Sequence, residues 1–308
     1  MKIHHLNCGT MCPWGGRLMD GRRRNGPARL VSHCLLIEAD QYGLVLVDTG
    51  LGLRDVRTPR PRLSGFFLRL NRPPLREEEM ALRQIERLGF CAADVRHIVL
   101  THLDFDHAGG IEDFPGAEVH VFRPELAAAT EGRRGFVARR RYRPMQWDEN
   151  VRWQPYDVGG EHWLGFTSVR NMRGLPPEIL LIPLIGHTWG HCGVAIQRDS
   201  GWLRHAGDAY FHFGEMDLAR PHCPPGLRAY QWMMEVDRRA RLGNQERLRA
   251  LARAGDGAVQ IFCAHDEDEF ERLRARSDAE IPASERDRIV PHAPVEPMDE
   301  RPPSPLRS

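Results

Sequence analysis

The sequence predicts an α+β protein, in which short buried strands alternate with helices. Short apolar runs rich in branched side chains recur along the chain, and several of them end in His, Asp or Gly. Between these runs lie segments with the apolar spacing and the end signals of helices. Because a strand places the residues that follow it at one edge of a sheet, side chains able to bind metal at several strand ends indicate a site at that edge.

Length and charge narrow the class of protein. A chain of 308 residues can bury a sizeable core as one large domain or two small ones. The formal net charge of +1 gives no reason to expect nucleic acid or an anionic membrane as a partner. The N-terminus lacks an apolar segment typical of a signal peptide, and no apolar run is long enough to span a membrane. We therefore expect a cytoplasmic protein.

The cysteines favour the same compartment. Seven cysteines are scattered along the chain, an odd number that suits a reducing environment better than a disulfide framework. Cys8 and Cys12 have a spacing close to that of a zinc knuckle, but no second pair accompanies them. We interpret both as packing residues.

Two apolar runs near the N-terminus predict a hairpin. Residues 32–38 and 43–47 read as strands, and the polar residues 39–42 between them read as its turn. The second strand ends in Asp48, followed by Thr49 and Gly50. Asp48 could cap backbone N–H groups of the next loop, or orient a histidine that binds metal, or be a plain turn residue.

The remaining elements follow from the same patterns. Further strands are expected at 97–100, 117–122, 178–185, 194–196, 201–206 and 259–263, and helices at 77–88, 124–130, 228–241, 244–253 and from 266 onward. We expect one domain over 1–276 and a Pro-rich, poorly ordered tail over 277–308.

Two further segments are expected to be irregular. Residues 53–76, rich in Arg and Pro, predict a loop that covers a cleft. The basic stretch 133–143 could be a lid over an anionic substrate, an oligomer contact or a solvated face.

Residues 101–110 carry the strongest chemical signal. They read T-H-L-D-F-D-H-A-G-G and directly follow a predicted buried strand. In an extended segment His102, Asp104 and Asp106 would project to one side, and a bend would bring His107 to the same centre. The two glycines after Ala108 allow a tight turn. The alternative, a loop of solvated polar residues, does not explain why His and Asp recur at later strand ends.

The complete set of motifs resembles a known family. D-T-G, H-x-D-x-D-H-A-G-G, G-H-T-x-G-H, G-D and A-H-D occur in this order over roughly residues 30–270, and together they resemble the metallo-β-lactamase-fold hydrolase superfamily. The resemblance implies an αββα four-layer sandwich with a metal site at one edge. Within the superfamily the chain most resembles the lactonase-like branch, which includes quorum-quenching acyl-homoserine lactonases.

The resemblance also implies a set of ligands for two divalent ions, most readily zinc. Carried over by motif, the ligands are His102, Asp104 and His187 for the first ion, Asp106, His107 and His265 for the second, and Asp208 as the bridge between them. His191, the second His of G-H-T-x-G-H, is usually not a ligand in the family, and we expect it to support the ligands or the fold.

Asp104 departs from the family, which usually has His at this position. Asp is shorter than His, so the backbone must come closer or a water must intervene. A carboxylate is also a harder ligand, which makes Mn or Fe more competitive with Zn. With Asp104, three carboxylates and a bridging hydroxide would cancel the charge of two divalent ions, where His would leave +1. A neutral centre is a weaker Lewis acid.

The implied reaction is hydrolysis of an ester or lactone carbonyl by a hydroxide that bridges two metals, N-acyl-homoserine lactones being one substrate class. Asp106 would orient the nucleophile and shuttle a proton. Tyr210 is a candidate donor to the substrate oxyanion, although a tyrosine of the core would fit equally. His212 and His222 could line the mouth of the site.

Several functions remain open from the sequence. A phosphodiester or sulfate ester hydrolase would need a cationic pocket, for which the stretch 133–143 is the one hint. A carboxylate at the position of Asp104 also occurs in the flavodiiron proteins of the superfamily, so a di-iron redox protein is an alternative. The last is a catalytically weak binding protein. We expect a small-molecule substrate, selected by loops 51–76 and 130–175, and a possible homodimer.

Overall fold

The chain is seen in a computed structural model that describes residues 1–131, 136–147, 150–157, 161–168, 171–254 and 258–280. Among these residues the strands are β1 (Lys2–Asn7), β2 (His33–Glu38), β3 (Leu44–Val47), β4 (Val95–Val99), β5 (Glu118–Phe122), β6 (Arg152–Tyr156), β7 (Glu161–Trp163), β8 (Phe166–Ser168), β9 (Ile179–Pro183), β10 (Cys192–Arg198), β11 (Gly201–His205) and β12 (Val259–Phe262).

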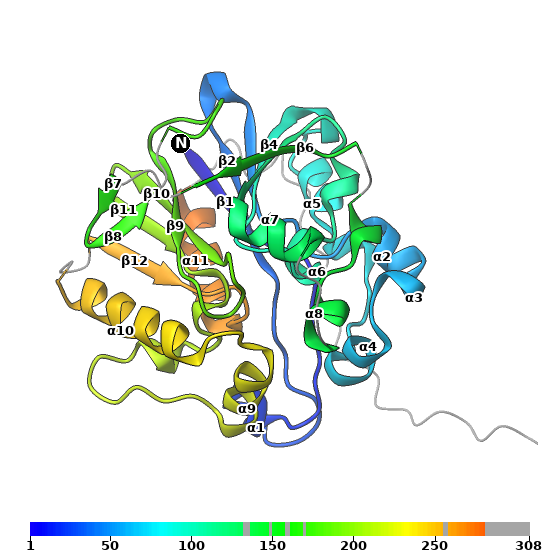
Figure 1. The fold of residues 1–308 in the computed structure, drawn as a ribbon, viewed down its shortest axis with the longest axis vertical. Helices are drawn as coiled ribbons and strands as arrows, with labels where there is room; N and C mark the ends of the chain where they lie inside the picture. Colours follow the sequence, from blue (N-terminus) through cyan, green and yellow to red (C-terminus); the bar gives the residue numbers. More distant parts are fainter. Residues whose placement is uncertain (132–135, 148–149, 158–160, 169–170, 255–257, 281–308) are drawn as a thin grey trace, which may run out of the picture.

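Helices connect and cover these strands (Figure 1). The α-helices are α1 (Arg17–Asp20), α2 (Leu53–Arg57), α3 (Pro59–Arg62), α4 (Gly65–Asn71), α5 (Ala81–Arg87), α6 (Phe105–Ala108), α7 (Arg123–Thr130), α8 (Phe136–Arg141), α9 (Pro225–Met234), α10 (Arg238–Ala254) and α11 (Glu267–Glu280). The 3₁₀ turns are η1 (Asp40–Tyr42), η2 (Glu77–Glu79), η3 (Ala92–Asp94), η4 (Ile111–Asp113), η5 (Pro144–Gln146), η6 (Gly207–Ala209) and η7 (Phe213–Met216).

Two main sheets form the centre of the molecule. The first has the order β1-β2-β3-β4-β5-β6, antiparallel through β3 and parallel from β3 to β6. The second has the order β12-β11-β10-β9, in which β11 and β12 run parallel. Strands β7 and β8 form a separate hairpin. The predicted hairpin of β2 and β3 is confirmed, with η1 as its turn.

Side-chain alternation along the strands divides the core into layers. Leu35 and Ile37 of β2 pack in the cluster between the sheets with Leu181 of β9, whereas Leu36 points to the outer cluster that α5 and α7 cover. On the far side, α10 packs Leu248 against the outer face of the second sheet. Figure 1 shows α10 on the opposite side of the molecule from α5 and α7. This arrangement is the predicted αββα sandwich.

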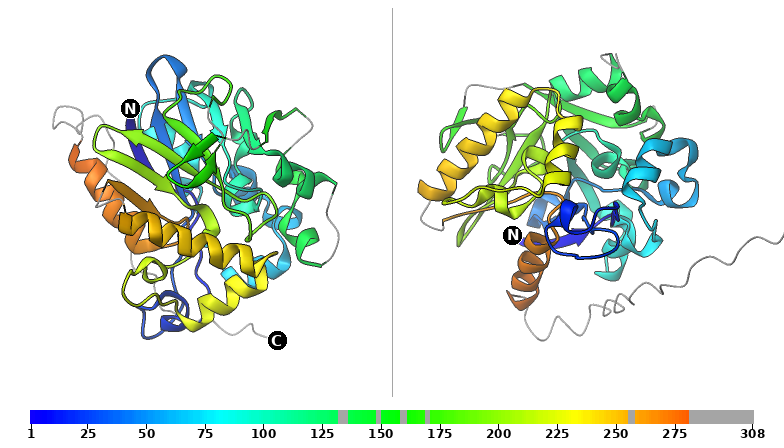
Figure 2. Two further views of the ribbon diagram at one scale, coloured as in Figure 1. Left: turned by 60° about the vertical axis from the view of Figure 1, so that its left-hand side comes forward. Right: turned by 90° about the horizontal axis from the view of Figure 1, so that it is seen from below.

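The N-terminal strand was not predicted. β1 pairs with β2, and α11 packs against β1, as the views in Figure 2 show. The segment 2–7 contains two adjacent histidines, which interrupt the apolar pattern by which a buried strand is recognised in a sequence. Both are buried, His4 beside Glu38 and His5 against His33. Polar residues satisfied by specific partners can occupy a buried strand, which the hydrophobic pattern alone does not reveal.

The segment 53–76 is not the predicted loop. It forms α2, α3 and α4 before an extended piece. The Ser64 side chain accepts a hydrogen bond from Phe67 N and caps α4, and Asp55 accepts from Gly52 N at the start of α2. The buried Arg62 pairs with Asp55 at 2.7 Å. Local caps and one buried ion pair therefore order a segment whose composition suggested irregular structure.

Other boundaries moved by a few residues. The helix predicted at 77–88 divides into η2 and α5. The break between α9 and α10 falls at 235–237, because Val236 N and Asp237 N donate to Gly186 O and Asp237 caps α10. The last helix continues to Glu280, past the domain boundary expected at 276. The rest of the predicted tail, 281–308, lies outside the described residues. No helix among the described residues is long and apolar enough to cross a membrane.

Candidate metal centre

All seven predicted ligands meet at one edge of the sandwich. Four follow β4, in the short loop 100–104 and helix α6. The other three stand after β9, β11 and β12 of the second sheet, in the loop 184–191, in η6 and at the end of β12. The ligands are His102, Asp104, Asp106, His107, His187, Asp208 and His265. Ends of strands from both sheets thus build the site, because each strand delivers its following residues to the same edge.

The first group has the spacing of a metal site. Asp104 Oδ2 lies 3.4 Å from His102 Nε2 and 3.1 Å from His187 Nε2. Asp208 Oδ2 lies 3.3 Å from His187 Nε2 and 3.8 Å from His102 Nε2. Ligands about 2.0–2.1 Å from a tetrahedral ion lie roughly 3.3–3.4 Å from one another. These four side chains therefore surround a space that fits a divalent ion.

The second group shares Asp208 with the first. Asp208 Oδ1 lies 3.3 Å from His107 Nε2 and 3.2 Å from His265 Nε2. Asp106 Oδ2 completes the group at 3.9 Å from His265 Nε2. His265 Nε2 also lies 3.2 Å from Asp208 Oδ2, so the Asp208 carboxylate contacts histidines of both groups, as expected of a bridging carboxylate.

Unpaired polar atoms support the same interpretation. His102 Nε2, His107 Nε2 and Asp208 Oδ1 are buried without a hydrogen-bond partner. An unsatisfied buried polar group costs about 1–3 kcal/mol, so native proteins rarely retain several together. All three atoms point to the spaces defined above, where metal ions would satisfy them.

Asp48 orients two of the histidines, as one of its predicted roles requires. Its Oδ2 lies 2.8 Å from His107 Nδ1, and its two oxygens accept hydrogen bonds from Thr101 N and Thr101 Oγ1 at 2.7 Å. Thr101 Oγ1 in turn lies 2.9 Å from His102 Nδ1. With Nδ1 of both rings engaged, Nε2 is left for a metal.

His191 is a supporting residue, as expected from its place in the motif. Its Nδ1 lies 2.9 Å from Leu184 O, and its Nε2 accepts a hydrogen bond from Asp208 N at 2.8 Å. Gly207, in the left-handed region at φ 53°, packs so closely that an added Cβ would lie 2.5 Å from the same Nε2. A glycine before Asp208 is therefore required by this contact.

Oppositely charged side chains in the centre stabilise one another even without an ion. Burial disfavours the charged form of Asp104, but Arg141 and His102 outweigh it and hold the pKa of Asp104 well below its usual range. Burial, helped by His107, lowers the pKa of His102 to about 4. Burial also opposes charge on His107, yet Asp208 and Asp48 raise its pKa to about 10. A metal would compete with that proton.

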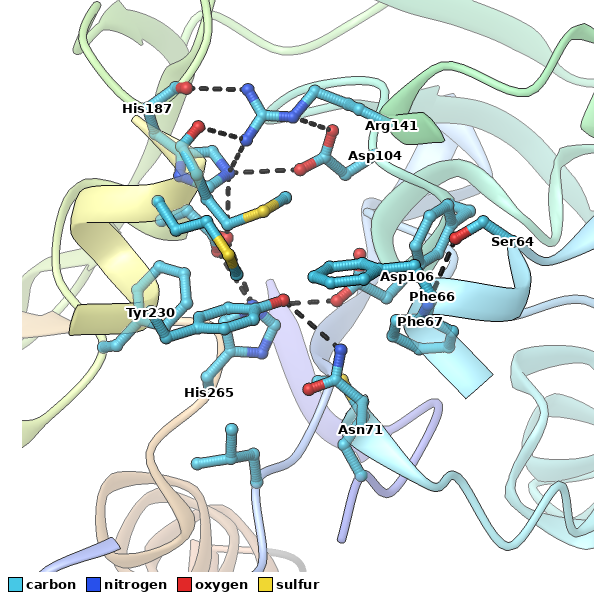
Figure 3. A pocket seen from close by; sticks show the side chains of 17 residues that line it. Ser64, Phe66, Phe67, Asn71, Asp104, Asp106, Arg141, His187, Tyr230 and His265 are labelled. Carbon is cyan, nitrogen blue, oxygen red and sulfur yellow. Dashed lines mark hydrogen bonds and ion pairs between the residues drawn. The ribbon is translucent and has the colours of Figure 1, made fainter. Parts of the chain in front are cut away.

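Arg141 is the feature of the centre that the sequence did not identify. Its guanidinium lies over Asp104, with Nε 2.9 Å from Asp104 Oδ1, as Figure 3 shows. The side chain is 2% exposed. Of the predicted basic stretch, residues 133–135 lie outside the described part, and Arg141 turns inward rather than to solvent. The signal that could have found it is Asp104 itself, because an extra buried carboxylate needs a counter-charge.

A largely apolar pocket of about 110 Å³ opens onto the centre. Asp104, Asp106, His187, Asp208 and His265 form its metal-binding end. The remaining walls are made by Met11, Leu30, Ser64, Phe66, Phe67, Asn71, Phe105, Arg141, Phe211, Tyr230, Met233 and Met234. Parts of the expected substrate-selecting loops 51–76 and 130–175 thus line the pocket.

Three predicted residues do not belong to this pocket. Tyr210 is completely buried, and its hydroxyl donates to Glu269 at 3.0 Å, so it faces away from the site. The predicted role for Tyr210 is therefore wrong, and it is a core tyrosine. His212 accepts from Gly214 N, and His222 contacts Arg220 O at an exposed position. Neither lines the mouth.

The tyrosine that does face the pocket is Tyr230 of α9. Its hydroxyl accepts a hydrogen bond from Asn71 Nδ2 at 3.3 Å and faces the pocket on the side of Asp106 (Figure 3). Sequence analysis missed this residue, because α9 is distant in sequence from every motif and the residues next to Tyr230 do not indicate a site.

Comparison with known proteins identifies the class. The family model of the metallo-β-lactamase superfamily matches residues 28–245, and the chain belongs to this superfamily. It is a metal-binding hydrolase of that class. A probable metallo-hydrolase of Mycobacterium tuberculosis is 40% identical over 274 residues, which are 89% of this chain and 83% of the relative. An N-acyl homoserine lactonase of Bacillus cereus is 32% identical over 96 residues, 31% of this chain and 38% of the lactonase.

Solved structures share the fold. An N-acyl homoserine lactone hydrolase, with the product N-hexanoyl-L-homoserine at its catalytic metal centre, matches with a TM-score of 0.65 and 21% identity, covering 88% of this chain and 95% of that one. A dizinc quorum-quenching lactonase in complex with a product matches with a TM-score of 0.54 and 15% identity, covering 85% and 86%. At these identities the similarity concerns the fold, and the predicted αββα architecture is confirmed.

Proposed function

We propose that this protein is a dinuclear metal hydrolase that cleaves the ester or lactone bond of small molecules carrying an apolar acyl chain. N-acyl-homoserine lactones are the first substrates to test. The observation that carries the proposal is the metal-binding group at the end of a largely apolar pocket. Such a pocket binds an acyl chain while presenting the carbonyl to the centre.

The apolar walls suit a flexible hydrocarbon chain. Phe66 and Phe67 of α4 lie on one side of the pocket, and Met233 and Met234 at the end of α9 line another part. Methionine side chains adapt to irregular ligands because they are unbranched and polarisable. Phe66 and Met233 are also partly exposed, at 41% and 37%, which places apolar surface where a chain would enter.

The polar groups have distinct roles in this proposal. Bound divalent ions would supply a polarised substrate carbonyl and an acidified water. Asp106 is one of the predicted ligands and lines the pocket, where its carboxylate would orient the nucleophile and shuttle a proton. Tyr230 O–H, fixed by Asn71, would donate to the oxygen that becomes negative during attack. We propose zinc as the first metal to test, with Mn or Fe as the alternatives that Asp104 raises.

A phosphodiester or sulfate ester fits the pocket less well. Arg141 is the cationic side chain among the described lining residues, and it is already engaged by Asp104 and by the carbonyls of His187 and Met234. An anionic substrate would therefore find no free positive side chain there. The predicted homodimer stays a prediction.

A chain-length series tests the proposal. Zn- and Mn-loaded enzyme is assayed with N-acyl-homoserine lactones of increasing acyl length, with aryl esters, and with aryl phosphates and sulfates. Each buried methylene is worth about 0.8 kcal/mol, so kcat/KM should rise up to about fourfold per methylene until the pocket is full. Turnover of phosphates or sulfates alone would reject the proposal, and absence of turnover on every substrate would favour a binding protein.

Two tyrosine variants separate the site from the core. Tyr230→Phe should lower kcat about a hundredfold to a thousandfold, as expected for loss of one donor to the oxyanion, and should change KM little. Tyr210→Phe removes a hydroxyl that is fully buried outside the pocket, and it should leave kcat unchanged while lowering stability. The opposite pattern would show that the wrong tyrosine has been assigned.

A further inference from the structure

We propose that Asp104 and Arg141 act as one unit that replaces a neutral ligand at the first metal position and sets which divalent ion it holds. The inference rests on the metal centre of the proposed function, but metal binding tests it without any substrate. Arg141 is here a positioning residue, because its guanidinium contacts two predicted ligands, Asp104 and, at 3.3 Å from Nη2, His187 Nε2, rather than a reacting atom.

The two oxygens of Asp104 have separate partners. Oδ1 lies 2.9 Å from Arg141 Nε, whereas Oδ2 faces the ligand nitrogens, 3.1 Å from His187 Nε2 and 3.4 Å from His102 Nε2. The guanidinium thus forms an ion pair with the other oxygen, Oδ1. With Oδ1 paired in this way, Asp104 would hold an ion through Oδ2, in place of a single imidazole nitrogen.

Arg141 is held in place from two further segments. Its Nη1 donates to His187 O at 2.8 Å, in the loop after β9, and its Nη2 donates to Met234 O at 2.7 Å, at the end of α9. Arg141 itself ends α8. Arginine stays protonated in proteins, and its planar group suits a fixed set of acceptors. The cation is therefore a permanent part of the centre.

The charge of the pair explains why Asp104 is tolerated. The sequence alone suggested that Asp104 would make the centre neutral and weaken it as a Lewis acid. Arg141 adds one positive charge directly behind Asp104, so the pair is neutral, as an imidazole would be. The centre keeps the electrostatic pull on a substrate oxygen, while its first position gains a hard oxygen ligand that favours Mn or Fe over Zn.

A cycle of four proteins tests the coupling: the native chain, Asp104→His, Arg141→Gln and the double variant. Each is stripped of metal, checked for folding by circular dichroism and titrated with Zn²⁺ or Mn²⁺ against a chromophoric chelator. Asp104→His alone should bind the first ion at least tenfold more weakly, because Arg141 would then face the ion with no carboxylate between them. The double variant should recover to within about threefold and should shift the Mn/Zn preference at least tenfold toward Zn.

A matched control and a second variant keep the test decisive. Arg62 is also buried, at 3% exposed, and pairs with Asp55 at 2.7 Å outside the metal-binding group. Arg62→Gln should leave both ion affinities unchanged. Arg141→Met, which also removes the charge but keeps a long side chain, replaces the glutamine variant in the cycle if the latter does not fold.

The proposal is overturned if Asp104→His binds both ions as tightly as the native chain. It is also overturned if Arg141→Gln changes the ion affinities by the same factor whether residue 104 is Asp or His. A failure of the proposed hydrolase function would appear as metal-loaded protein without turnover, and it would leave these affinities unchanged.

Discussion

The substitution Asp48→Asn tests how the centre holds its histidines. Asp48 is buried and accepts from Thr101 N and Thr101 Oγ1, and it lies 2.8 Å from His107 Nδ1. Asparagine has the same shape but only one acceptor oxygen, so an N–H of its amide must face one of these three donors. His107 can avoid that clash by moving its proton to Nε2, the atom that would bind the second ion.

The expected loss can be estimated from this geometry. Removing a partner that fixes a ligating histidine typically costs 10–100-fold in metal affinity, which is about 1.4–2.7 kcal/mol. We expect that loss for the second ion. The first ion should lose less, because Asp48 reaches His102 only through Thr101 Oγ1. Chelator competition with Zn²⁺, fitted to two sites, measures both affinities.

Two further variants make the result specific. Thr101→Val removes the contact to His102 Nδ1 but leaves that between Asp48 and His107, so it should weaken the first ion more than the second. Asp40→Asn is the matched control. Asp40, like Asp48, has a positive φ, but it is exposed in η1, at the opposite end of β3 from Asp48. If Asp48→Asn binds the second ion within twofold of the native chain, the proposed orienting role is refuted.

Two predictions concern stability. Burial raises the pKa of Glu269 to about 8 from 4.5, so the folded state keeps a proton that the unfolded state has lost; native stability should therefore fall by up to about 1.4 kcal/mol per pH unit between these values. Denaturation at pH 6 and pH 8 should show this slope in the native chain and not in Glu269→Gln, and parallel curves would contradict it. Gly190→Ala should destabilise by about 1–3 kcal/mol, because the new Cβ would lie 2.1 Å from Glu125 N. Gly243 lies within α10 with open space around it, so Gly243→Ala should leave stability unchanged or raise it. Equal losses of stability in both variants would count against the packing argument.

The residues of the candidate metal centre could be predicted from the sequence because each one follows closely after a strand. The strands were recognised as short apolar runs, and the residues that follow them lie at one edge of the sandwich. Asp48 could be suspected for the same reason, since it directly follows β3. The resemblance to the superfamily then added the architecture, and the structure and the family match confirm it.

Order in the segment 53–76 could not be predicted, because its helices depend on contacts made at a distance. α2 and α3 are held by the buried pair of Arg62 with Asp55, and Arg62 also reaches Glu112. Neither contact can be recognised from the amino-acid composition of the segment. A segment rich in Arg and Pro therefore looks irregular until its partners are known.

What the sequence determined, then, is the set of groups that can bind metal, because each of them follows a predicted strand and strand ends meet at the sheet edge. Only the tertiary structure decided which tyrosine faces the pocket and which arginine pairs with Asp104. Tyr210 and Tyr230 differ in the direction of their side chains, and Arg141 is one of several arginines in its stretch. Side-chain direction and charge pairing arise when distant segments pack, and burial makes the pairing obligatory.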